Sequence, residues 1–158
     1  MMKIFPTLLP TYIIINVGNK VGDIFMDKYI KIIKDIIDYH SEEEWFEFKE
    51  NWFEAHGIGE YISALSNAAA ICRKEFAYLI WGVNDETHEI VGTKFDFRKD
   101  VKKEPLEHYL ARQTMPDVSF SFHEVIFEGK RVVLLEIPKA KNIPTSFDGI
   151  KHVSGYIV

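Results

Sequence analysis

A nearly unbroken apolar run at residues 76–83 constrains the fold of this chain more than any other feature of its sequence. Apolar residues occupy consecutive positions there rather than alternate ones, which is typical of a strand buried on both faces. The polar residues 84–87 follow directly and predict a turn. We expect residues 88–92 to return as the partner strand, so the apolar run should lie inside the fold.

Hydrophobic periodicity predicts three helices around this strand. Apolar residues recur at three- and four-residue steps in residues 26–39, 57–72 and 105–115, as in amphipathic helices. In the second segment, small residues such as Ser63 and Ser66 would let the helix lie close to a sheet.

Two further segments alternate as strands do. In residues 45–49, Phe46 and Phe48 should face the core, with Trp45, Glu47 and Lys49 on the other face. Residues 118–137 predict a hairpin that turns at residues 128–130. Together the elements predict one α+β domain with a mixed β-sheet of about five strands and two to three packed helices.

The charge balance limits the kind of partner this chain can bind. Its net charge is -5 over 158 residues, which argues against a protein whose whole surface attracts phosphates. Any nucleic-acid site must therefore be local. Cys72 is the single cysteine, so an internal disulfide is excluded, and no paired Cys/His spacing predicts a zinc site. A reducing cytoplasm is the expected location, without a membrane span.

The N-terminal stretch is apolar and has two interpretations. It resembles a weak signal peptide, but Pro6 and Pro10 interrupt the apolar run and no Ala-x-Ala-like cleavage site follows. It is also too short to span a membrane. We interpret residues 1–25 as an N-terminal extension left by an upstream start, with Met26 opening the domain at residues 26–158, while secretion stays the alternative.

Three motifs stand in a fixed order along the chain. They read Glu42-x-x-x-x-Glu47-Phe48-Lys49, then Ile-Ser-Ala-Leu-Ser-Asn at residues 62–67, then Ile-Trp-Gly-Val-Asn-Asp at residues 80–85 followed by Ile-Val-Gly at residues 90–92. Together they resemble the AlbA_2 domain of the Schlafen group, also called the divergent AAA_4 domain, over residues 42–153. In that family further domains usually follow, so the resemblance implies that the chain is truncated at its C-terminal end.

The resemblance implies a nucleic-acid-binding domain, for DNA or RNA, of a bacterial transcriptional regulator that acts without catalysis. Phosphate contacts would combine with exposed rings such as Trp45 or Trp52. The alternative is that these basic residues are ordinary solvated surface and that Trp52 packs under the second helix. The basic residues expected to contact phosphates are Lys49, Arg73, Lys74, Arg98, Lys102 and Lys103.

A metal-dependent nuclease is the runner-up that the resemblance implies. In the Schlafen branch three acidic residues gather a divalent cation, and the matching positions here are Glu42, Glu47 and Asp85. Such carboxylates suit Mg²⁺ or Mn²⁺, and Lys49 could hold the phosphate. Glu42 and Glu47 would point to opposite faces of a regular strand. For both to bind one metal ion, Glu42 must therefore lie in the loop that enters the strand. The plainer interpretation is a solvated Glu42, a turn residue Asp85 and a Glu47–Lys49 salt bridge.

Other functional classes are less well supported by the residues. No Gly-x-x-x-x-Gly-Lys-Ser/Thr motif is present, so we do not expect an ATPase, and His56, His108 and His123 lack metal-ligand spacing. A third class is a self-association module that forms a homo-oligomer through an exposed sheet edge or the apolar N-terminal stretch. Whether the chain is an enzyme stays open at this point.

Overall fold

The predicted buried strand lies in the middle of a four-stranded sheet. The computed structural model describes residues 20–39, 45–153 and 156–157. β1 runs parallel to β2, while the β2–β7 and β7–β6 pairs are antiparallel, so the sheet is mixed, as predicted. The order of its strands is β1 (Phe46–Lys49), β2 (Phe76–Trp81), β7 (Lys130–Pro138) and β6 (Ser121–Phe127).

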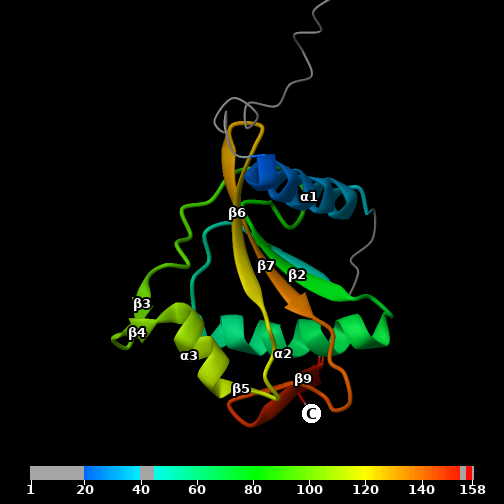
Figure 1. The fold of residues 1–158 in the computed structure, drawn as a ribbon, viewed down its shortest axis with the longest axis vertical. Coiled ribbons are helices and arrows are strands. Elements are labelled where there is room, and N and C mark those ends of the chain that lie inside the picture. The colour runs from blue at the N-terminus through cyan, green and yellow to red at the C-terminus, as the bar shows by residue number, and fades with distance from the viewer. Residues whose placement is uncertain (1–19, 40–44, 154–155, 158) are drawn as a thin grey trace, which may run out of the picture.

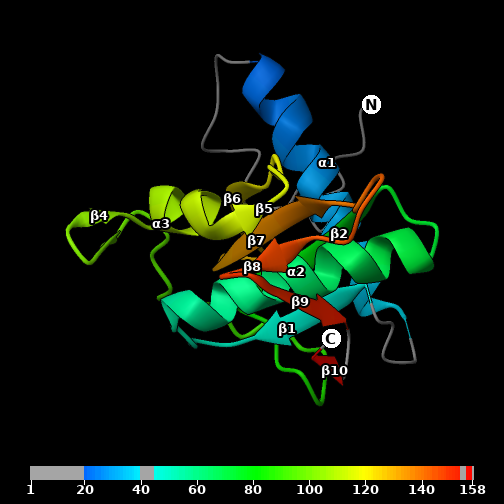
Figure 2. The same ribbon diagram turned by 90° about the horizontal axis from the view of Figure 1, so that it is seen from below.

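Helices cover both faces of this sheet, which confirms the α+β fold class. α1 (Lys20–Ile37) crosses one face, and α2 (Ala55–Ile71) lies along the other with α3 (Leu106–Gln113) beside it (Figures 1 and 2). All three predicted helices are therefore present, with ends that differ by a few residues. None of the helices in the described part of the chain is both long and apolar enough to cross a membrane.

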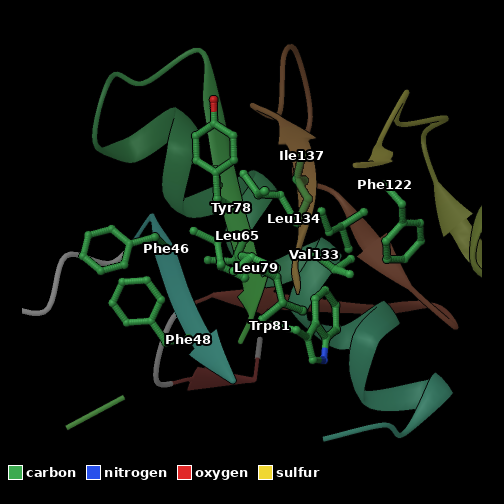
Figure 3. Packing of buried hydrophobic residues seen from close by; sticks show 14 of the residues in the cluster. Phe46, Phe48, Leu65, Tyr78, Leu79, Trp81, Phe122, Val133, Leu134 and Ile137 are labelled. Atoms are coloured by element: carbon green, nitrogen blue, oxygen red, sulfur yellow. The ribbon is translucent and has the colours of Figure 1, made fainter. Parts of the chain in front are cut away.

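The core forms where the helices meet β2. All the side chains of β2 except that of Phe76 are buried, and Phe46 and Phe48 are buried on β1, as predicted (Figure 3). α1 contributes Tyr29 and an isoleucine stripe, and burying each such side chain contributes about 1.5–3 kcal/mol. The core therefore sets the positions of β1, β2 and α2 relative to one another.

The prediction that residues 88–92 form a partner strand was wrong. Only one bridge forms, between Val83 and Ile90, because the backbone bends at two glycines. Gly82 and Gly92 have φ angles of 104° and 82°, which glycine adopts readily. The carbonyl of Gly82 accepts hydrogen bonds from the N–H groups of both Val91 and Gly92, which holds these residues beside Gly82, and the two edges of β2 are occupied by β1 and β7.

Several short strands are present, and apart from those in residues 144–153, which resemble the start of the family's last strand, they were not predicted. They are two to four residues long, too short to give a clear alternation in the sequence. β3 and β4 form a hairpin, and the others form a second four-stranded sheet in the order β10-β9-β8-β5. Their bounds are β3 (Asp100–Val101), β4 (Glu104–Pro105), β5 (Thr114–Met115), β8 (Ser146–Phe147), β9 (Ile150–Val153) and β10 (Tyr156–Ile157).

Part of the expectation about the N-terminal stretch lies outside the described residues. This holds for residues 1–19 and for the choice between an upstream start and a signal peptide. α1 begins at Lys20, inside the predicted extension of residues 1–25.

The second sheet is attached to α2 through the side chain of Asn67. Its Nδ2 donates to the carbonyls of Thr145 and His152 at 2.9 and 2.6 Å, and its Oδ1 accepts the N–H of Thr145 at 2.7 Å. Asn67 is buried, so these bonds replace those that water would supply.

Two serines of the same helix face complete this attachment. Ser63 Oγ donates to the carbonyl of Thr145 and accepts the N–H of His152, and Ser66 Oγ lies 2.9 Å from Thr145 Oγ1. The small serines let the segments approach α2, as predicted for this helix. The Ile-Ser-Ala-Leu-Ser-Asn motif at residues 62–67 thus has a structural role.

We predict that Asn67→Ala destabilises the fold by about 3 kcal/mol, because it leaves buried groups of Thr145 and His152 without partners. Urea unfolding measures the loss. Asn142→Ala, at an exposed loop position, is the control and should change stability by less than about 0.5 kcal/mol. Equal effects of the two substitutions would contradict the role given to Asn67.

Candidate functional site

Four side chains gather where β1 ends, and we call them the Lys49 cluster: Glu47, Lys49, Trp52 and Tyr61. Lys49 Nζ lies 2.9 Å from Glu47 Oε1, and its distances to the ring centroids of Trp52 and Tyr61 are 5.5 and 5.0 Å. The Tyr61 hydroxyl donates to the same Glu47 oxygen at 3.4 Å. Such distances are typical of cation–π contacts, so the rings and the carboxylate hold the ammonium in place.

The alternation of β1 explains this arrangement. Phe46 and Phe48 fill one face of the strand, so Glu47 and Lys49 point to the other face, where Tyr61 approaches from α2. Trp52 is fixed because Trp81 Nε1 donates to its carbonyl at 2.7 Å. Trp52 packs against Tyr61 of α2, which agrees with the alternative that Trp52 packs under the second helix.

The Lys49 cluster is partly open to solvent. The Lys49 and Glu47 side chains are 22% and 36% exposed, so their salt bridge contributes less than about 1 kcal/mol. Burial by itself lowers the pKa of Lys49, but the neighbouring Tyr61 and Glu47 outweigh it and raise that pKa above its ordinary value. Lys49 is therefore a charged, accessible cation.

The N-terminus of α2 next to this cluster is already occupied. The Glu54 carboxylate caps it by accepting the N–H groups of His56 and Gly57 at 3.1 and 2.6 Å. A helix N-terminus can attract phosphate, but here a carboxylate of the chain takes that place.

The predicted carboxylate cluster is only partly within the described residues. Glu42 lies outside them, whereas Asp85 is exposed in the turn after β2. The Asn84 side chain donates to Glu50 at 2.7 Å, which brings this turn to the end of the sheet where the Lys49 cluster lies. Among the described residues, no three His, Cys, Asp or Glu side chains are grouped closely enough to hold a metal ion. The site of Glu42, Glu47 and Asp85 stays a prediction.

The predicted phosphate-binding residues other than Lys49 lie in three parts of the fold. Arg73 and Lys74 follow the C-terminal end of α2, about 25 Å from its N-terminal end at a rise of about 1.5 Å per residue. Arg98 pairs with Glu124 at 3.0 Å. Lys102 and Lys103 occupy the exposed β3–β4 turn (Figure 1). Lys49 is therefore separate from the other basic residues predicted for this role.

The aromatic residues differ from the prediction in one respect. Trp45, expected as an exposed stacking ring, is only 6% exposed, because it packs between Tyr39, Phe46 and Tyr78. That prediction was wrong. Phe53, which the sequence analysis missed, is 43% exposed. It follows Trp52 in a connection without alternation, so no periodic signal marked it.

Phe53 is held on a rigid base. Its ring packs on Phe95 at a centroid distance of 5.7 Å, and Phe95 stacks on the buried Trp81 at 4.1 Å. The Asn51 side chain accepts the backbone N–H of Lys94 at 2.8 Å, which ties the two segments together. Lys94 is exposed, so this part of the surface combines a cation with an accessible ring.

A second polar cluster lies beneath α1 and is more buried. Glu136 of β7 accepts hydrogen bonds from Tyr29 and Tyr78, and Tyr29 stacks on His123 at 3.9 Å. Burial and the Glu136 charge raise the pKa of Tyr29 to about 12, and burial lowers that of His123. These contacts fasten α1 to the sheet, so this cluster has a structural role.

The fold is thus that of an α+β domain in which a mixed sheet with a parallel edge strand carries helices on both faces. The family model for Schlafen, AlbA_2 matches residues 42–156, more than half of the chain, and the chain belongs to this family. The expected resemblance is confirmed, and α1 precedes the matched region.

Solved structures that are similar to the chain include those of two proteins. One is the DIP2311 protein from Corynebacterium diphtheriae, at 15% identity and a TM-score of 0.47; the match covers 84% of this chain and 26% of that one. The other is the N-terminal domain of a protein from Nitrosomonas europaea described as related to the ATP-dependent DNA helicase RecG. It has 18% identity and a TM-score of 0.49, with 77% of this chain and 83% of that one covered. No curated protein matches the sequence.

We predict that Glu47→Gln lowers the pKa of the Lys49 ammonium, because it removes the negative charge beside Nζ. NMR titration of the Lys49 side chain measures this pKa. Glu50→Gln is the matched control, because Glu50 bonds to Asn84 instead and should leave the Lys49 pKa unchanged. The same pKa in Glu47→Gln and the native chain would refute the coupling.

Proposed function

We propose that this chain binds nucleic acid, DNA or RNA, through a surface made of the Lys49 cluster, Phe53 and Lys94. The observation that carries the proposal is the partly exposed Lys49 ammonium, which is held between the rings of Trp52 and Tyr61. The family resemblance points to the same class of ligand.

Each part of this surface has a role in such a complex. Lys49 and Lys94 supply the positive charges that phosphates need. Phe53 offers an open ring on which a base can stack, a contact worth about 1–3 kcal/mol per base. Since Phe53 packs on Phe95, which itself stacks on Trp81, little side-chain freedom is lost on binding.

Glu47 sets a limit on the affinity of this surface. A phosphate that contacts Lys49 competes with the carboxylate 2.9 Å from Nζ. Together with the net charge of -5, this favours a moderate affinity that falls with salt in proportion to the phosphates contacted.

Binding of labelled single-stranded RNA, single-stranded DNA and duplex DNA over a range of salt concentrations tests the proposal. We expect Phe53→Ala to weaken single-strand binding about tenfold, because a stacking contact is lost. Lys49→Ala should reduce the slope of log affinity against log salt concentration by about one, the change expected for the loss of one phosphate contact.

Lys31→Ala is the control for charge, because Lys31 is exposed on α1, away from the Lys49 cluster. It should leave affinity and salt slope unchanged. Binding that Phe53→Ala and Lys49→Ala leave intact would contradict the proposed surface, and absence of binding in every arm would contradict the function.

The duplex DNA arm also tests a finer role. The family resemblance supports a place in a transcriptional regulator, where a domain of this kind would hold the protein on DNA. A transcriptional regulator of this kind would act in the cytoplasm, the location expected from the sequence.

A metal-dependent nuclease is the second candidate, favoured by the geometry of Glu47. Both donors to this carboxylate reach Oε1, so within the described residues Oε2 has no partner and is available to a cation. Glu42 and Asp85 would complete the set, and Mg²⁺ or Mn²⁺ would supply an activated water and stabilise the leaving oxygen. Lys49 would orient the phosphate beside Glu47.

For this second candidate we expect Glu47→Gln and Asp85→Asn each to abolish Mn²⁺-dependent cleavage of labelled tRNA with little change in binding. Glu54→Gln, a carboxylate that caps α2, is the control and should keep cleavage. Cleavage that survives Glu47→Gln would rule out a nuclease site built on Glu47, while loss of cleavage with EDTA alone would not identify which residues hold the metal.

A further inference from the structure

A groove opens at the C-terminal end of α2, away from the Lys49 cluster. Its volume is about 240 Å³, and it is lined by Ala70 and Ile71 of α2, by residues 140–144 and by Val153 of β9. Ile71 and Ile143 are 62% and 60% exposed, so two large apolar side chains stand open at the groove. Such exposed apolar groups often mark a contact with a partner.

The groove has a firm base. Asn67 also lines it, but the amide of Asn67 is occupied by Thr145 and His152 and offers little to a polar ligand. The loop that forms the other wall is fixed by the hydrogen bond from the N–H of Ala140 to the carbonyl of Ser66. An apolar group can therefore enter without a large rearrangement of the walls.

The charges around the groove are mostly positive. Lys141 is the one charged side chain among the described residues that line it. Arg73 comes two residues after Ile71 and Lys139 precedes the loop, while the Lys74 ammonium lies over the Trp45 ring at 4.7 Å. The nearby carboxylate of Glu75 is already paired with Lys139 at 2.7 Å. This local excess of positive charge stands in a chain of net charge -5, so the groove complements an acidic partner.

We propose that this groove binds an acidic peptide segment of a protein partner. An apolar side chain of the peptide would lie between Ile71 and Ile143, and its carboxylates would face Lys141 and Arg73. The volume is below the about 300 Å³ at which small-molecule sites begin, so it suits one or two side chains. The apolar lining favours a peptide, whose aliphatic side chains it can bury, over the charged phosphates of a nucleic acid.

This site is independent of the proposed nucleic-acid surface. That surface lies at the N-terminal end of α2 and the groove at its C-terminal end, about 25 Å apart along the 17-residue helix. Substitutions in one should therefore leave the other unchanged.

Methyl NMR of the full chain tests the proposal with three probes. The first is a pool of 12-residue peptides of Asp, Glu, Leu and Ile, the second is the same pool with Lys in place of the acidic residues, and the third is a single-stranded oligonucleotide. We expect the acidic pool alone to shift the Ile71 and Ile143 methyl signals. Absence of shifts with the acidic pool, equal shifts with the lysine pool, or shifts of these methyls by the oligonucleotide would each overturn the proposal.

Two variants locate the contact. Ile143→Asp and Lys141→Glu should each weaken binding of the acidic pool at least tenfold, because they introduce negative charge into the groove. Ile150→Asp and Lys99→Glu are matched controls at exposed positions that do not line it, and they should bind as the native chain does. Equal affinities in the groove variants and the controls would overturn the assignment.

Discussion

The burial of β2 on both faces is the constraint on which the rest of this structure depends. Its side chains from Ala77 to Trp81 are buried, so the strand needs a helix layer on each side and a neighbour along each edge. α1 and α2 supply the layers, and β1 and β7 supply the neighbours. The parallel pairing with β1 places the end of that strand, with Lys49, beside the end of β2.

The family motifs are largely explained by this packing. Asn67 and the serines before it hold the second sheet on α2 through buried hydrogen bonds. Gly82 permits the bend after β2, where a Cβ would lie 3.1 Å from the carbonyl oxygen of Arg131. Residues that identify the family can therefore have a structural role, whereas Glu47 and Lys49 have exposed atoms that a ligand can reach.

The two proposed sites use the two ends of α2 in different ways. At the N-terminal end, the connection from β1 presents cations and rings, while Glu54 caps the helix itself. At the C-terminal end, apolar side chains of the last turn remain uncovered beside basic residues. A rigid helix packed against the sheet would hold both surfaces at a fixed separation, so a nucleic acid and a protein partner could be bound together.

The sequence by itself determined the three helices, the central strand, the β6–β7 hairpin and the family, because long periodic segments and ordered motifs reflect local geometry and burial. It also placed Glu47 and Lys49 on one face of β1. Tertiary structure decided that Trp45 is buried and Phe53 is exposed, since both depend on which rings pack around Trp81 and Tyr78. It likewise decided the short strands and the groove, because contacts between residues distant in the sequence create them.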